Sequence, residues 1–116
     1  MIIYLAGPIN DSSDKECFDW RNYCKEKLNP NHSTLDPMTR DYRGKELDNI
    51  RSIVEDDKKD IDSSDIILVN YFKPSVGTSM ETYYAWSIGK LVYIINNSEK
   101  PLSPWLLYHS NYVFNR

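Results

Sequence analysis

The feature that most constrains the fold is the segment 65–90, in which an apolar run, a loop and a helical pattern follow one another. Residues 66–70 are typical of a buried strand, 73–77 are punctuated by proline and glycine, and 79–89 favour a helix. A strand, a glycine loop and a helix in this order form half of a βαβ unit. Because ligands bind at the carboxyl ends of the strands in open α/β sheets, this loop is the first place to look for a site.

The rest of the chain repeats the alternation of strands and helices. We expect further strands over residues 2–6, 34–36, 91–95 and 112–114, and helices over 14–28, 45–61 and 103–109. The polar, irregular segment 38–45 is interpreted as a mobile lid or a binding loop. Such alternation predicts an α/β fold, namely a single Rossmann-like or flavodoxin-like domain over residues 1–116 with a doubly wound parallel sheet of about five strands.

Composition excludes several classes of protein. A chain of 116 residues with 41% hydrophobic residues is the size of one domain, and a net charge of −3 with no basic patch argues against binding to long nucleic acid. No apolar run approaches the roughly 20 residues that cross a bilayer. The chain starts directly with a strand pattern and lacks the features of a signal peptide, so we expect a cytoplasmic location and no membrane partner.

Glu81 stands out because it lies inside the apolar stripe of the helix predicted over 79–89. With about 100° per residue, Glu81 falls between Tyr84 and Ala85 on the helical wheel, and a charge there is costly unless it is paired or used. Thr78 and Glu81 also fit the S/T-x-x-E capping box, so a capping role and a catalytic role both stay open. A carboxylate in the first helical turn would be held ionised by the helix dipole, which suits a nucleophile.

Asp57 is a second acid predicted to point inward. It fills a gap in the stripe formed by Leu47, Ile50, Val54 and Ile61. A buried pair with a distant Arg or Lys is one explanation. The other is that two inward carboxyl groups at one strand-end crevice divide nucleophilic and acid–base work, as in glycoside cleavage. Tyr4, in the first strand, needs a partner for its hydroxyl group, and a carboxylate across the crevice would provide it.

Two loops offer backbone amides and hydroxyl groups for a ligand, although each is also explained as an ordinary capped turn. Residues 7–13 follow the first strand, and residues 73–79 precede the central helix. The expected substrate-binding residues are Gly7, Pro8, Ile9, Asn10, Ser75, Gly77, Thr78, Ser79 and Met80. His32 and His109 are isolated, and no Cys/His/Asp spacing typical of a metal site occurs.

Several of these motifs together resemble a known family. The run YLAGP at residues 4–8, then Asp57, then PSVGTSME at residues 74–81 is similar to the nucleoside 2-deoxyribosyltransferase superfamily, which also contains the nucleoside 5′-monophosphate N-glycosidases. The resemblance implies cleavage of the N-glycosidic bond of a small-molecule nucleoside or nucleotide, without a metal or organic cofactor. It implies that Glu81 is the nucleophile, that Asp57 is the acid for the departing base, and that Tyr4 orients Glu81.

The chain also departs from the family pattern. Transferases acting on free nucleosides usually carry an acidic residue six positions before the nucleophile, where this chain has Ser75. A serine there resembles the monophosphate hydrolases, yet the first loop lacks the Arg and paired glycines of their phosphate-binding loop. The alternatives are therefore a 5′-monophosphate N-glycosidase and, from a different class, a non-catalytic nucleotide-binding domain.

The resemblance also implies an oligomer. In the family, the C-terminal part of a neighbouring subunit completes the site. This makes Ser103, Tyr108 and His109 candidates for contacts across the interface of a homodimer or larger homo-oligomer.

Overall fold

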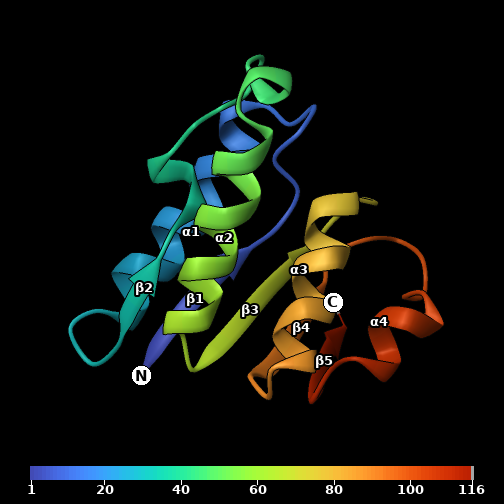
Figure 1. Cartoon of the computed structure of the whole chain (residues 1–116). Coiled ribbons are helices and arrows are strands. Elements are labelled where there is room, and N and C mark those ends of the chain that lie inside the picture. Colours follow the sequence, from blue (N-terminus) through green and yellow to red (C-terminus); the bar gives the residue numbers. More distant parts are fainter. Residues whose placement is uncertain (116) are drawn as a thin grey trace.

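The computed structural model describes residues 1–115 and contains one five-stranded sheet with helices on both faces (Figure 1). The strands are β1 (Ile2–Ala6), β2 (Ser33–Leu35), β3 (Ile66–Tyr71), β4 (Leu91–Asn96) and β5 (Tyr112–Asn115). The helices are α1 (Asp14–Leu28), α2 (Ile50–Ser63), α3 (Val76–Ser87) and α4 (Pro104–Tyr108), with the short 3₁₀ helices η1 (Pro37–Thr39) and η2 (Glu46–Asp48). The predicted α/β class and the five strands are confirmed; of the predicted range 1–116, only Arg116 lies outside the described residues.

The sheet has the strand order β2-β1-β3-β4-β5, and all its pairs are parallel. This is the order of the flavodoxin-like fold. The chain leaves β1 toward β2 on one side and then crosses back to β3 on the other. The order therefore reverses between β1 and β3, and a crevice opens at the carboxyl ends of these two strands.

The two faces of the sheet have separate cores. Because side chains alternate along a strand, Ile3 and Leu5 of β1 face α1, where Trp20 and Cys24 pack against them. Tyr4 faces the opposite core, which is formed with α2, α3 and α4. Tyr4 is therefore directed toward the helices that carry the two inward acids. Both cysteines, Cys17 and Cys24, are free thiols.

The predicted helix over 45–61 begins later than expected. Residues 46–48 form η2, and α2 starts at Ile50. The predicted apolar stripe is wrong in its first half, since Leu47 is 87% exposed and Ile50 61% exposed, whereas Ile61 is buried. The reason is that Leu47 lies in η2, before the helix, and the inward face of α2 is formed by Ile53, Asp57 and Ile61, which are spaced four apart.

The central helix begins earlier than predicted. Helix α3 starts at Val76, and Ser75 is its N-cap, accepting a hydrogen bond from the Thr78 amide at 3.3 Å. Glu81 is therefore in the second turn, so the predicted capping box at Thr78 and Glu81 is wrong. Met80 is 67% exposed; the buried residues of α3 are Thr78, Thr82 and Ala85.

Within the described residues, none of the helices combines the length and the apolar character needed to cross a bilayer.

Gly7, directly after β1, is packed tightly enough to exclude a side chain. A Cβ atom at this position would lie 2.8 Å from Cζ2 of Trp20 and 3.1 Å from the backbone oxygen of Asn70. We expect Gly7→Ala to lower the free energy of unfolding by about 1–3 kcal/mol through this overpacking. The measurement is urea unfolding followed by circular dichroism.

The matched control is Gly77→Ala, in the first turn of α3, where an added Cβ meets nothing within 4 Å. It should be neutral or stabilising, because alanine favours a helix by about 1 kcal/mol over glycine. Equal stability of the two variants would contradict the close packing at Gly7.

Candidate active site

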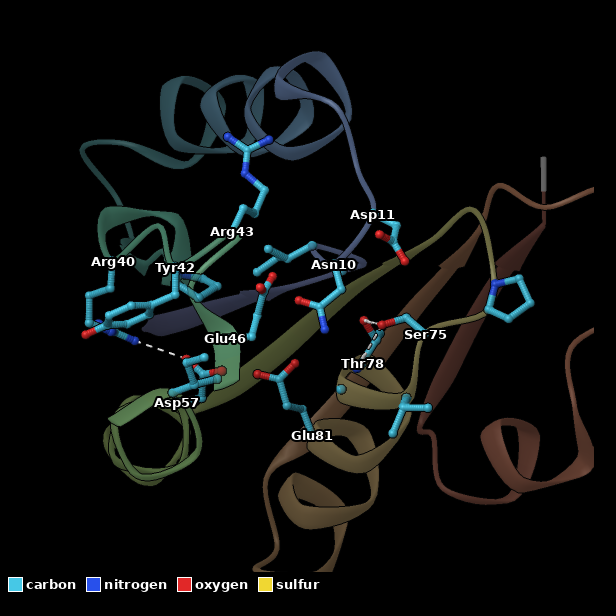
Figure 2. Close-up of a pocket in the computed structure, with 17 residues that line it drawn as sticks. Asn10, Asp11, Arg40, Tyr42, Arg43, Glu46, Asp57, Ser75, Thr78 and Glu81 are labelled. Carbon is cyan, nitrogen blue, oxygen red and sulfur yellow. Dashed lines mark hydrogen bonds and ion pairs between the residues drawn. The ribbon is translucent and has the colours of Figure 1, made fainter. Parts of the chain in front are cut away.

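A cavity of about 320 Å³ lies at the carboxyl ends of β1 and β3, between α2, α3 and the segment that carries η1 and η2. Its size is within the range of small-molecule sites. The side chains of the predicted acids point into it from two helices (Figure 2). The residues lining it are Gly7, Ile9, Asn10, Asp11, Pro37, Arg40, Tyr42, Arg43, Glu46, Ile53, Asp57, Pro74, Ser75, Val76, Gly77, Thr78 and Glu81.

Tyr4 does not line the cavity, but it binds Glu81, which does. Its side chain is fully buried, and its hydroxyl group donates a hydrogen bond to Oε2 of Glu81. Burial, and then the negative charge of Glu81, raise the pKa of Tyr4 well above its usual value. The phenol therefore stays protonated and acts as a fixed donor to Glu81, so the structure brings these two residues together as predicted.

Glu81 has an unusually high affinity for a proton. Burial, followed by the charge of Asp57, raises the pKa of Glu81 to about 8, although the Tyr4 hydrogen bond and the charge of Arg21 act in the opposite direction. The expectation that the helix dipole holds Glu81 ionised is wrong. Because α3 begins at Val76, the carboxyl group lies one turn beyond the amides that would stabilise its charge.

Asp57 is paired with an arginine that is distant in sequence. Nη2 of Arg40 lies 3.2 Å from Oδ1 of Asp57 and 2.8 Å from Oδ2 of Asp60. Burial nevertheless raises the pKa of Asp57, with Arg40 opposing this shift and the charge of Asp60 adding to it. The two acids share the cavity and influence one another, and such perturbed carboxyl groups are typical of functional sites.

The other predicted binding residues divide between two surfaces. Gly7, Ile9, Asn10, Ser75, Gly77 and Thr78 line the cavity. Pro8 does not, because its side chain is buried in the protein interior.

Ser79 and Met80 lie outside the cavity, which corrects their assignment. Residues three and four apart share a helical face, so Gly77, Thr78 and Glu81 face the cavity while Ser79 and Met80 turn away. The latter two line a second, apolar cavity of about 510 Å³ together with Ser103 and His109. Tyr108 is 72% exposed and lines neither cavity.

Sequence reasoning identified the segment 38–45 as a possible binding loop but not its individual side chains. Arg40, Tyr42 and Arg43 all line the cavity. Arg43 connects this loop to the start of α1. Its Nη2 lies 2.6 Å from a carboxylate oxygen of Asp14, and its Nη1 lies 3.1 Å from the backbone oxygen of Ser12. The cluster of basic and aromatic residues in an irregular segment was the available signal, but their partners are too distant in sequence to be inferred.

These features define an α/β protein with a small-molecule cavity at the sheet's switch point and a pair of carboxyl groups inside it. The family model of nucleoside 2-deoxyribosyltransferase matches residues 3–115, and the chain belongs to this family of enzymes. The resemblance found in the sequence is thereby confirmed.

A solved structure supports the fold. A 2-deoxyribosyltransferase from the psychrotolerant bacterium Bacillus psychrosaccharolyticus superposes with a TM-score of 0.81 at 16% sequence identity, covering 100% of this chain and 87% of that chain. None of the curated proteins matches the sequence.

The raised pKa of Glu81 makes a prediction about stability. From the ordinary value of 4.5 up to about 8, folded Glu81 binds more protons than unfolded Glu81, so the free energy of unfolding falls as pH rises through this window. Glu81→Gln has no such charge to bury and can still accept from Tyr4. We expect this variant to melt about 4 °C or more above wild type at pH 8, and the difference to shrink toward pH 4.5.

Thermal unfolding across this pH range checks the expectation, with Glu26→Gln, an exposed change on α1, as the control. A melting temperature of Glu81→Gln that tracks wild type at every pH would contradict the burial of an unfavourable charge.

Proposed function

We propose that this protein cleaves the N-glycosidic bond of a 2′-deoxynucleoside and transfers the deoxyribosyl group to another base through a covalent intermediate on Glu81. The observation that carries the proposal is that Glu81 and Asp57 both line one cavity, and that the Tyr4 hydroxyl group donates a hydrogen bond to Glu81. Family membership supports the reaction class.

In the first step, the Glu81 carboxylate attacks the anomeric carbon, and the bond from this carbon to the base nitrogen breaks. Asp57 gives its proton to the departing base, which leaves neutral. The transition state has oxocarbenium character, which a neighbouring carboxylate stabilises. In the second step, a nitrogen of the incoming base attacks the anomeric carbon, the ester bond to Glu81 breaks, and Asp57 takes up the proton that the incoming base releases.

This mechanism requires one proton for the two acids. The pair loses its last proton with an apparent pKa of about 8, because the charge of one acid disfavours ionisation of the other. Near neutral pH the pair is therefore singly protonated. In the reactive form this proton is on Asp57, and the Tyr4 hydrogen bond favours that form because it stabilises the carboxylate of Glu81.

The charges of the cavity favour a free nucleoside over its 5′-monophosphate. Four carboxyl groups line it, from Asp11, Glu46, Asp57 and Glu81. The two lining arginines are already paired, Arg40 with acids of α2 and Arg43 with Asp14 and Asp41. A phosphate dianion would meet more negative than available positive charge. At position 75 a serine is the feature that this chain shares with the monophosphate hydrolases. The Ser75 hydroxyl oxygen already accepts hydrogen bonds from the amide and the hydroxyl group of Thr78 at the start of α3.

A homo-oligomer is part of the proposal. Ser103 and His109 line the second cavity, whose apolar rim exposes Met80, Tyr83 and Trp105. A second copy of the chain would cover this apolar surface.

The first test is a product assay on wild-type protein with a deoxynucleoside and its 5′-monophosphate, each with and without a second free base. We expect a base-swapped nucleoside when the acceptor base is present, and a kcat/KM for the monophosphate at least about tenfold lower, given the repulsion of like charges.

Each contrary outcome of this assay has a defined meaning. Free base formed equally without acceptor would make the enzyme a hydrolase. Preferential cleavage of the monophosphate would favour the N-glycosidase alternative. Binding of nucleosides without any released base would favour a non-catalytic binding domain.

The second test separates the roles of the two acids. Asp57→Asn should lower kcat/KM for an ordinary deoxynucleoside by about 10²–10⁴-fold, the usual contribution of a general acid. The loss should be much smaller for 7-methyl-2′-deoxyguanosine, whose cationic base departs without needing a proton. Glu81→Gln should be inactive on both substrates. Equal losses of Asp57→Asn on both substrates would contradict the assignment of Asp57 as the acid.

A further inference from the structure

Arg21 is a buried cation close to the site but outside the cavity. It belongs to α1, its side chain is 0% exposed, and its guanidinium group lies over the ring of Trp20. The desolvation of a buried charge costs several kcal/mol unless partners compensate for it. The proposed reaction assigns no role to this residue, so its partners are informative.

The hydrogen-bond partners of Arg21 are backbone oxygens at the end of β1 and in α1, and one of them belongs to Gly7, which lines the cavity. Its Nη2 donates to the backbone oxygen of Gly7 at 3.0 Å, and its Nε donates to that of Leu5 at 3.3 Å. These two residues flank Ala6, the last residue of β1, and Leu5 directly follows Tyr4. Its Nη1 donates to the backbone oxygen of Cys17 in α1 at 2.8 Å. One guanidinium group therefore fixes the end of β1 against α1.

Asp36 connects Arg21 to η1, which is a further segment next to the cavity. Nε of Arg21 lies 3.7 Å from Oδ1 of Asp36, which accepts a hydrogen bond from the Met38 amide at 2.8 Å and so caps η1. Arg40, directly after η1, lines the cavity. Arg21 thus joins β1, α1 and the start of η1 at a single buried point.

The charge of Arg21 also acts on Glu81. The titratable groups around Glu81 come from several elements: Tyr4 of β1, Arg21 of α1, Asp57 of α2, and Asp11, Arg40, Arg43 and Glu46 from the loops and η2 lining the cavity. Arg40 and Arg43 are engaged by carboxylates of their own. Nη2 of Arg21 binds the backbone oxygen of Gly7, which lines the same cavity as Glu81, so the positive charge lies directly behind the cavity wall. From there it lowers the pKa of Glu81, against the effect of Asp57.

We propose that Arg21 is a positioning residue for the reaction: it holds the end of β1 and the start of η1 in place, and its buried positive charge stabilises the carboxylate form of Glu81. The catalytic part of this inference rests on the proposed function. The electrostatic part concerns Glu81 alone and is measurable without turnover. Asp36 moderates the effect because its negative charge partly neutralises Arg21, although its shorter ion pair, at 2.5 Å, is with Nζ of Lys25.

The test is a carboxyl-carbon NMR titration of protein labelled with ¹³C-glutamate, in which the Glu81 resonance is assigned by its loss in Glu81→Gln. Arg21→Gln removes the cation and should raise the pKa of Glu81 by about one unit, a typical size for an environmental shift. Asp36→Asn keeps the cap acceptor but removes the neutralising charge, so it should lower this pKa. Arg21→Lys retains the charge and should leave it near the wild-type value.

A merely structural role would shift the pKa of Glu81 in the same direction in Arg21→Gln and Asp36→Asn. Shifts of opposite sign in these two variants therefore distinguish this proposal from such a role. If Arg21→Gln does not fold, the pKa of Glu81 in Asp36→Asn and in Arg21→Lys still tests the proposal. In active protein, the high-pH limb of kcat/KM should move with the Glu81 titration in each variant. A Glu81 pKa that is unchanged in Asp36→Asn, or shifted upward, would overturn the proposal. If wild type titrates as expected but releases no base from any nucleoside, the proposed function fails and the action of Arg21 on Glu81 stands.

Discussion

The structure depends most on placing the Glu81 carboxyl group in a buried position next to a second acid. Burial and the charge of Asp57 both oppose ionisation of Glu81, so the carboxylate form exists only because specific groups stabilise it. Tyr4 provides the hydrogen bond, and Arg21 provides a positive charge from behind the cavity wall. An arrangement that costs stability and perturbs the proton affinity of two acids is expected at a site that uses them.

The flavodoxin-like topology explains how these groups meet. Tyr4 comes from β1, Glu81 from the helix after β3, and Asp57 from the helix before it. They meet because the strand order reverses between β1 and β3, which opens the sheet edge at this point. Alternation along β1 directs Tyr4 toward α2 and α3, while its neighbours Ile3 and Leu5 pack against α1. The same strand therefore supplies both the core and the site.

Much of this arrangement could be predicted from the sequence, because local patterns carry it. The run of apolar residues in β3, the glycine loop and the inward acids indicated the fold class and the convergence of Glu81 with Asp57. The start of α3 was misplaced because Ser75 and Thr78 are both good N-cap residues, and only the structure shows which one accepts from the helix. That difference removed the capping explanation for Glu81.

The long-range partners were beyond reach of the sequence. Arg40 pairs with acids 17 and 20 positions away, and Arg21 binds the backbone oxygens of Leu5 and Gly7, which any residue would possess. Leu47 and Ile50 continue an apolar pattern that periodicity assigns to the core, yet they are exposed because Ile53, Asp57 and Ile61 form the inward face of α2. Periodicity reports the side of a helix on which residues lie, but not what that side faces.

The most direct measurement of the central claim is the mass of the Glu81 peptide after acid quench of the enzyme with a deoxynucleoside and no acceptor base. The same mass is measured a second time with Asp57→Asn and 7-methyl-2′-deoxyguanosine, whose base leaves without a proton from Asp57. Removing the released base by filtration prevents the reverse reaction. The account predicts an added mass of one deoxyribosyl unit on Glu81, absent in Glu81→Gln. Turnover with unmodified Glu81, or the adduct on another residue, would contradict it.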